Sequence, residues 1–258
     1  MSDPQSIDYD AIESRVPIGV IKAETGDVAF YMPSQMAAMR FQTLFTKEPE
    51  TARWISGFAP GGVLVDIGAN IGGYTIWAAK HRRMRVFAFE PEAQNFAYLN
   101  KNIILNSLDD QVTAFPAAIS DETRFSVLNL GDTRIGGSLN SFAEPVDENL
   151  EPREPLYRQG SVATSLDQLV ADGVLPVPDH IKIDVDGFEH KVVAGARTVL
   201  ADPGVSSVLI ELNNTIVAHR EILDVMAGLG FDAPPELSNR LAEKGGGNCI
   251  FRRAGAGG

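Results

Sequence analysis

A glycine-containing turn follows the first apolar run of the chain, and its residue types suit a bound nucleoside cofactor. The segment begins at the end of the apolar run 63–67, reads Asp66-Ile67-Gly68-Ala69-Asn70-Ile71-Gly72, and leads into a helical pattern. Glycines let the backbone pass close to a ligand, and a helix that begins after such a turn offers free N–H groups. Glu90 ends the next apolar run, about 20 residues after the turn, where a doubly wound fold places a carboxylate on a ribose. The two features together predict a nucleoside cofactor.

The turn is not typical of a dinucleotide site. Asn70 stands where a pyrophosphate-binding turn has its second glycine, and its side chain would crowd the diphosphate. No tyrosine of the sequence has a lysine four residues later, the pair that short-chain reductases need. Asp66, directly before the glycines, suits a ligand with positive charge, such as the ammonium and sulfonium of S-adenosylmethionine. The residues therefore favour S-adenosylmethionine, and a nicotinamide-dependent oxidoreductase on a Rossmann-like sheet is the alternative.

A second group of acidic residues follows the apolar run 180–185. Asp184, Asp186 and Glu189 lie across the end of that run and the turn into the next helical pattern, and Glu211 ends another apolar run. Ligands of open parallel sheets bind outside the carboxyl ends of the strands, so we expect these acids at the same cleft as the glycine turn. A carboxyl group buried there would have a raised pKa and act as a general base on an alcohol. Asp184 is the first choice for this catalytic role, and Asp186 is the second.

Other roles remain open for the same acids. They could cap the following helix or tie down neighbouring loops. Asp184, Asp186 and Glu211 could also hold a divalent metal through oxygen ligands, an alternative that the sequence does not favour because the set includes no fixed histidine. Glu189, Glu211 and, from a glycine-rich segment, Ser138 are the candidate substrate-binding residues.

Short apolar runs alternate with helical patterns, which is typical of an α/β protein with a mostly parallel sheet covered by helices. The predicted strands are residues 63–67, 85–90, 111–118, 180–185, 206–212 and 248–253, and Pro116 indicates that regular pairing ends there. Helices are expected after Pro91 and over 192–200, and residues 35–58 read as an amphipathic helical addition.

These patterns divide the chain into an N-terminal arm and helical extension (1–58), a cofactor-binding domain (59–253) and a flexible tail (254–258). Residues 131–160 are rich in glycine, proline and acidic residues and have no sustained period. An irregular stretch of this length is uncommon in a compact domain. We interpret it as a lid or substrate loop, with a surface insertion as the alternative.

The amino-acid composition restricts the classes of partner and the cellular compartment that we expect. The chain has 22 Lys and Arg against 34 Asp and Glu, a formal net charge of −12. This balance argues against a nucleic-acid surface, which needs a concentrated basic patch. A single cysteine, Cys249, fits a reducing compartment, and we see neither a signal peptide nor an apolar run long enough to span a bilayer. We therefore expect a cytoplasmic protein; the sequence defines neither the oligomeric state nor the identity of the acceptor.

Four segments resemble the FkbM family of S-adenosylmethionine-dependent methyltransferases: VDIGANIGGYTIWAAK, FEPEAQNFAYLNKNIILN, SLDQL and IKIDVDGFEHKVVAGA. They occur in the family's order between about Glu48 and Asn213. The resemblance implies the class I methyltransferase fold, a doubly wound and mostly parallel seven-stranded sheet with one antiparallel strand and helices on both faces. Its implied cofactor residues are Asp66, Gly68, Asn70 and Gly72 at the methionine end, and Glu90 at the ribose.

The resemblance also implies O-methyl transfer to a hydroxyl of a small-molecule, glycan or polyketide-like acceptor. This chain has Asp186 where the family often has glutamate. Amino-group methyltransferases often carry an Asn/Asp-Pro-Pro-aromatic segment at this strand end, and its absence here favours oxygen as the acceptor atom. A cofactor-binding but non-catalytic partner subunit remains a further alternative.

Overall fold

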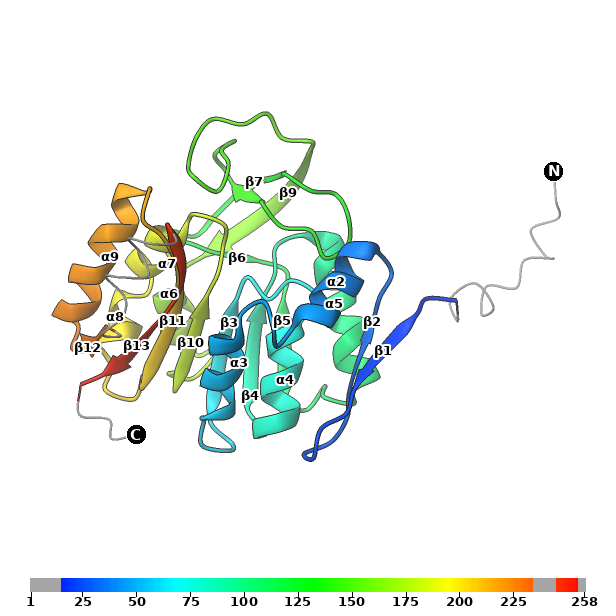
Figure 1. The fold of residues 1–258 in the computed structure, drawn as a ribbon. Coiled ribbons are helices and arrows are strands. Elements are labelled where there is room, and N and C mark those ends of the chain that lie inside the picture. The colour runs from blue at the N-terminus through cyan, green and yellow to red at the C-terminus, as the bar shows by residue number, and fades with distance from the viewer. Residues whose placement is uncertain (1–14, 234–244, 255–258) are drawn as a thin grey trace.

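The computed structural model describes residues 15–233 and 245–254, and a seven-stranded sheet forms its centre (Figure 1). The strand order is β12-β13-β11-β10-β3-β4-β5. These strands are β3 (Val63–Ile67), β4 (Arg85–Phe89), β5 (Val112–Phe115), β10 (His180–Ile183), β11 (Ser207–Asn213), β12 (Phe231–Asp232) and β13 (Gly246–Arg253). Strand β13 runs antiparallel to both of its neighbours, and the other strands are parallel. The predicted seven-stranded sheet with one reversed strand is therefore confirmed.

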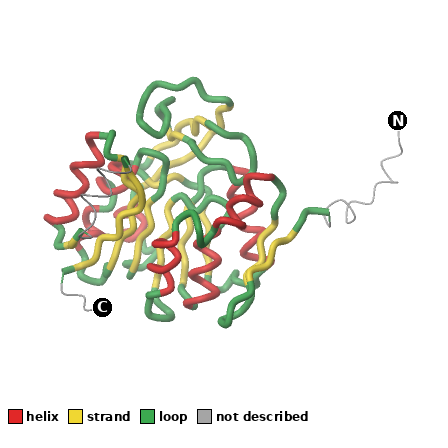
Figure 2. The backbone as a smooth tube through the Cα atoms, viewed as in Figure 1, coloured by secondary structure: helices red, strands yellow, loops and turns green. Residues whose placement is uncertain are grey.

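Apolar side chains on both faces of the sheet create two cores. Along β3, Leu64 belongs to one buried cluster and Val65 to the other, as expected from the period of two. The first cluster is covered by α3 (Pro49–Ser56), α4 (Gly73–Arg82) and α5 (Ala93–Leu105). The second is covered by α6 (Leu166–Ala171), α7 (Glu189–Ala194), α8 (Arg197–Ala201) and α9 (Val217–Gly228). Figure 2 shows the resulting helix–sheet–helix layers.

The N-terminal region contains more than the expected helices. A hairpin of β1 (Ile18–Ile21) and β2 (Val28–Tyr31) precedes α2 (Gln35–Thr43), and residues 44–48 separate α2 from α3. Trp54 of α3 is buried and its Nε1 donates to Ser207 Oγ at 2.8 Å, so this helix packs into the main core. Most of the predicted arm and tail lies outside the described residues.

A second sheet stands over the carboxyl ends of the central strands (Figure 1). Its order is β6-β9-β7-β8, with β6 (Ala118–Ile119), β7 (Arg124–Leu130), β8 (Ser141–Phe142) and β9 (Tyr157–Thr164). The predicted strand 111–118 therefore divides around Pro116, with its first part in the central sheet and Ala118 in the second. Residues 131–160 were expected to lack regular structure, but they contain β8 and the start of β9. No helix in the described ranges has the length and apolar character needed to cross a bilayer.

Candidate functional site

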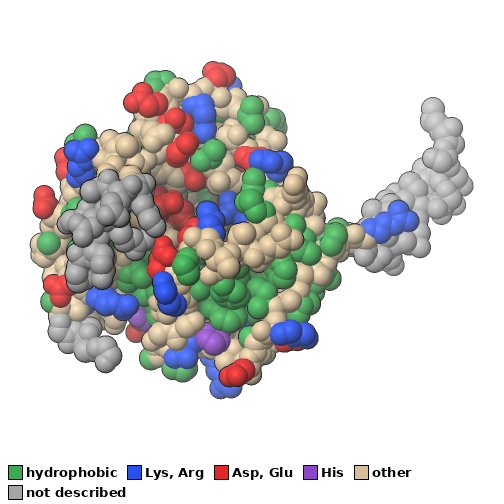
Figure 3. Space-filling model, in the orientation of Figure 1, with side chains coloured by type: hydrophobic (Ala, Val, Ile, Leu, Met, Phe, Trp, Pro, Cys, Tyr) green, Lys and Arg blue, Asp and Glu red, His purple; other side chains and the backbone are tan. Residues whose placement is uncertain are grey.

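Two adjoining cavities lie at the carboxyl ends of the parallel strands. The larger has a volume of about 700 Å³ and the smaller about 100 Å³. The residues that line both cavities are Arg40, Gly68, Asn70, Ser138, Asp184 and Asp186. Figure 3 shows acidic and basic side chains side by side near the middle of the corresponding face. Five of the ten predicted site residues thus meet at the junction of the cavities, and all of the others except Gly72 line one cavity.

The glycines of the turn after β3 have direct steric explanations. Gly68 has a φ of +80°, and a Cβ there would lie 1.8 Å from the carbonyl oxygen of Asp184. Gly72 has a φ of +91°, precedes α4, and a Cβ there would lie 2.6 Å from Leu99 Cδ1. Gly68 lines both cavities, whereas Gly72 lines neither. Gly68 therefore lets the ends of β3 and β10 approach, and Gly72 shapes the start of α4.

Glu90 is buried in the wall of the smaller cavity, directly after β4. One carboxylate oxygen accepts from the backbone N–H of Asn70 at 2.8 Å, and the other accepts from that of Glu92 at 2.9 Å. Burial raises the pKa of Glu90 to about 7 despite these two hydrogen bonds. Each oxygen keeps a further lone pair, so the group can accept additional hydrogen bonds.

Asp66 and Lys182 form a buried pair on the neighbouring strands β3 and β10. The two residues lie opposite one another in the parallel register, and Lys182 Nζ is 3.8 Å from Asp66 Oδ1. Thr75 donates to Asp66 Oδ2 at 2.6 Å, but Asp66 Oδ1 has no hydrogen-bond partner among the described residues. Burial raises the pKa of Asp66. The larger cavity is thus lined by a buried acid that can accept one more donor.

Asp184 and Glu211 contradict the expectation of a raised pKa on Asp184. Lys182 Nζ lies 2.8 Å from Asp184 Oδ2. Burial alone would raise the pKa of Asp184, but the charge and hydrogen bond of Lys182, together with a hydrogen bond from Glu211, lower it to about 2. The ionised Asp184, together with burial, raises the pKa of Glu211 to about 9. Glu211 is therefore protonated at neutral pH and donates a hydrogen bond to Asp184. Asp184 is a weak base because the unprotonated form is so strongly stabilised.

Asp186 is the acid with the properties that were expected of Asp184. It has a left-handed φ of +55°, and its Oδ2 accepts from the backbone N–H groups of Leu139 at 2.7 Å and Asn140 at 3.3 Å. Burial raises the pKa of Asp186 to about 6, with a contribution from the nearby charge of Asp184. Near neutral pH this carboxyl group can both hold and release a proton.

The side chain of Glu189 holds the loop that precedes α7. Its two oxygens accept from the backbone N–H groups of Val185 at 2.8 Å and Gly187 at 3.1 Å, and His219 Nε2 lies 3.1 Å away. Glu189 is almost fully buried and begins α7. Its carboxylate is therefore occupied by the loop that carries Asp184 and Asp186, which fits the alternative that these acids tie down neighbouring loops better than it fits substrate binding.

The metal alternative gains no support. Across residues 15–233 and 245–254, no three histidine, cysteine or acidic side chains are grouped so that they could hold a metal ion. Within the proposed set, Asp184 is bound to Lys182, and Asp186 accepts from backbone N–H groups.

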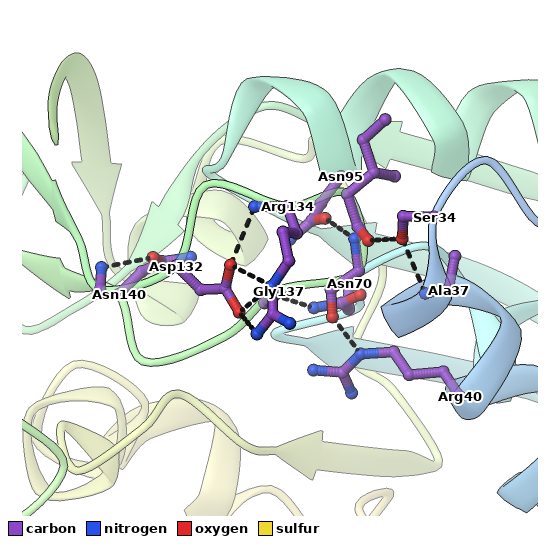
Figure 4. Close-up of polar contacts among 12 residues, drawn as sticks. Ser34, Ala37, Arg40, Asn70, Asn95, Asp132, Arg134, Gly137 and Asn140 are labelled. Atoms are coloured by element: carbon purple, nitrogen blue, oxygen red, sulfur yellow. Dashed lines mark hydrogen bonds and ion pairs between the residues drawn. The ribbon is translucent and has the colours of Figure 1, made fainter. Parts of the chain in front are cut away.

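Residues 131–140, which we call the strap, cross the junction of the cavities and are held from several sides (Figure 4). Ser34 Oγ donates to the carbonyl of Ile135 at 2.5 Å, and Arg40 Nε donates to that of Gly136. Asn70 Nδ2 donates to Gly137 O at 2.7 Å.

Asn95 of α5 also holds the strap, because it accepts from Gly136 N at 2.7 Å and donates to Gly137 O at 3.1 Å. Part of the predicted lid or substrate loop is thus a fixed wall of the site, and Ser138 belongs to it.

Sequence reasoning gave no role to Lys182, Arg40 or Asn95. A lysine within the apolar strand IKIDV was a usable signal, because a buried ammonium needs an acidic partner. Arg40 and Asn95 had no such signal, since each meets the strap only in the folded chain.

The sheet order, the single reversed strand and the glycine turn after β3 define a class I methyltransferase fold. The methyltransferase FkbM domain family matches residues 66–233. The chain therefore belongs to the FkbM family of S-adenosylmethionine-dependent methyltransferases, which confirms the resemblance and leaves the nicotinamide alternative without support.

Three relatives are similar to different shares of this chain and of their own length. The chain is 30% identical over 200 residues to the 31-O-demethyl-FK506 methyltransferase FkbM of Streptomyces tacrolimicus, covering 69% of this chain and 75% of that one. It is 28% identical to the hexuronic acid methyltransferase AglP of Haloferax volcanii, covering 58% and 56%. It is also 28% identical to a tRNA (guanine(37)-N(1))-methyltransferase of Batrachochytrium dendrobatidis, covering 59% and 33%. A solved structure of methyltransferase FkbM from Methylobacillus flagellatus KT is similar with a TM-score of 0.48 at 15% identity, covering 85% of this chain and 55% of that one.

Proposed function

We propose that this chain is an O-methyltransferase that acts on a hydroxyl of a small-molecule, glycan or polyketide-like acceptor, with S-adenosylmethionine as the methyl donor. The observation that carries the proposal is Asp186, a carboxyl group with a pKa of about 6 at the junction of the two cavities. Methylation of an alcohol requires removal of the hydroxyl proton, and a group that titrates near the working pH is suited to accept it.

Residues of both cavities fit the cofactor. Glu90 would hold the ribose hydroxyls, because its carboxylate lines the smaller cavity and retains free lone pairs. The unpartnered Oδ1 of Asp66 would accept from the methionine ammonium, and Gly68 and Asn70 would line the methionine end. Gly72 would act indirectly, through the position of α4. When bound, S-adenosylmethionine supplies an electrophilic methyl group.

The acids at the strand ends would have different roles toward the acceptor. Asp186 would accept the hydroxyl proton, while the N–H groups of Leu139 and Asn140 hold its carboxylate in place. Asp184 stays ionised because it is paired with Lys182, and it would position the acceptor rather than deprotonate it. Glu211 is protonated and would act as a hydrogen-bond donor. This assignment reverses the order of Asp184 and Asp186 expected from the sequence.

The larger cavity suits a hydroxylated acceptor with an apolar part. Its lining includes Met36, Met39, Phe41 and Leu44, from α2 and the residue that follows it, together with the polar groups described above. Two relatives are named for acceptors of this kind, an O-demethylated FK506 and a hexuronic acid. The net charge of −12 supports a small-molecule or glycan acceptor over the tRNA for which another relative is named.

The test is methyl transfer from S-adenosylmethionine to a panel of hydroxylated glycans and polyketides, amines and tRNA, followed by mass spectrometry. We expect methylation of a hydroxyl acceptor only. Asp186→Asn should lower turnover by about 10²- to 10⁴-fold and remove the pH dependence near 6, with little change in cofactor affinity. The matched variant Asp184→Asn should lower turnover less and keep that pH dependence. Methylation of tRNA or amines alone would refute the acceptor class, and cofactor binding without methylation of any acceptor would indicate the non-catalytic subunit.

A further inference from the structure

Arg40 of α2 stands at the junction of the two cavities. It lines both of them, together with Asp184 and Asp186. Its Nε donates to the carbonyl of Gly136 in the strap, which fixes the plane of the guanidinium group (Figure 4). Its two terminal nitrogens have no hydrogen-bond partner in the described part of the chain. Arg40 therefore presents free, oriented donors at the site.

The charge pattern around the cavities separates Arg40 from the other cations there. Within the described ranges, every other lysine or arginine that lines either cavity has a carboxylate partner: Lys47 with Glu48, Arg124 with Glu122, Lys182 with Asp184, and Lys191 with Glu144. Arg40 has no carboxylate within 4.0 Å among the described residues. It is also the only described cation that lines both cavities. An unpaired guanidinium beside two acids is suited to an incoming anion.

We propose that Arg40 binds the α-carboxylate of the methionine part of S-adenosylmethionine. This inference rests on the proposed function, which places that methionine at the junction. The carboxylate would otherwise face the ionised Asp184 and the titrating Asp186, and a guanidinium offers two parallel donors to a carboxylate. The N-terminal extension is then part of the cofactor site, joined to it through the strap.

The test compares S-adenosylmethionine with decarboxylated S-adenosylmethionine, which keeps the sulfonium and the ammonium. Affinities are measured by isothermal titration calorimetry on the full chain. Wild type should bind S-adenosylmethionine at least tenfold more tightly than the decarboxylated ligand. Arg40→Met should weaken binding of S-adenosylmethionine at least tenfold and leave the decarboxylated ligand within twofold. Arg40→Lys, which keeps the charge but loses the fork of donors, should fall between wild type and Arg40→Met.

Arg134→Met is the control, because Arg134 lies in the strap, pairs with Asp132 and lines neither cavity. It should leave both affinities unchanged. The inference fails if Arg40→Met weakens both ligands equally, which would make Arg40 a support for the strap, or if it leaves S-adenosylmethionine binding intact. A wild-type protein that binds neither ligand would instead refute the proposed cofactor and hence the proposed function.

Discussion

The two walls of the candidate site are built in different ways. One is the strand-end wall, formed by Asp66, Glu90, Asp184 and Glu211 at the ends of β3, β4, β10 and β11, and the other is the strap with α2. Side-chain hydrogen bonds in the strand-end wall join residues 2 to 20 positions apart, or neighbouring strands in fixed register. The side-chain hydrogen bonds to the strap from Ser34, Arg40, Asn70 and Asn95 join residues 41 to 101 positions apart. Short sequence motifs can therefore predict the strand-end wall, whereas the strap and α2 come together only in the folded chain.

The difference also concerns stability. The strand-end wall is part of the central sheet. Asp66, Glu90 and the neighbouring Lys182 are buried there beside apolar strand residues. The strap has no regular structure and is fixed by individual side chains such as Asn70 and Asn95. Segments with few buried apolar contacts open at lower free energy than core strands. We therefore expect the strap to open independently of the strand-end wall.

The largest effect should come from Gly68→Ala in the strand-end wall. The new Cβ would lie 1.8 Å from the carbonyl oxygen of Asp184, at a φ of +80° that alanine rarely adopts. We expect a loss of about 3 kcal/mol or more in the free energy of unfolding, measured in urea. Gly160→Ala in β9 is the control, because no atom lies within 4 Å of its added Cβ, and it should change stability by about 0.5 kcal/mol at most. Equal stability of the two variants would disprove the close approach of β3 and β10.

Such local constraints explain what the sequence could predict. The predicted strand 63–67 coincides with β3, and Glu90 follows β4 as expected, because apolar runs and turn residues act over short distances. The spacing of Lys182 in β10 and Asp184 directly after it correctly placed the two side chains on the same side. The predicted pKa of Asp184 was nevertheless wrong. Burial alone would have raised it, but the charge of Lys182 and the hydrogen bonds from Lys182 and Glu211 together outweigh burial, a balance that the spacing alone could not give.

Contacts between distant segments explain what the sequence could not predict. The β1–β2 hairpin is held by α5 and the residue that follows it: Asn102 accepts from Tyr31 N at 2.9 Å, and Asn106 accepts from Ala29 N at 2.8 Å. The irregular composition of residues 131–140 predicts a loop but not its position over Asn70. These arrangements depend on tertiary hydrogen bonds, for which a single sequence has no periodic signal.

A second test asks whether the strand-end wall holds a proton at neutral pH. The folded-state pKa of Glu211 is about 9, above the ordinary value of 4.5, so between these values the folded state binds a proton that the unfolded state lacks. The free energy of unfolding should therefore fall as pH rises through this window, by at most about 1.4 kcal/mol per pH unit from this group. Glu211→Gln lacks the titrating proton. Its free energy of unfolding relative to that of wild type should therefore increase from pH 7 to pH 9, as measured by urea unfolding. Parallel pH profiles for the two proteins would show that Glu211 ionises normally.

The smallest effect should come from Asn95→Ala, which removes two hydrogen bonds to the strap without touching the strand-end wall. Asn95 is buried, accepts from Gly136 N and donates to Gly137 O, so its loss should cost the strap about 1 kcal/mol of local stability. Hydrogen–deuterium exchange should become roughly fivefold faster over residues 131–140 and stay unchanged over residues 63–68. Asn100→Ala is the matched control on the same helix, since within the described residues Asn100 Nδ2 donates to Phe96 O and not to the strap. If the faster exchange reached residues 63–68, the two walls would open as one unit, and the strap could not release a bound cofactor while the strand ends remain folded.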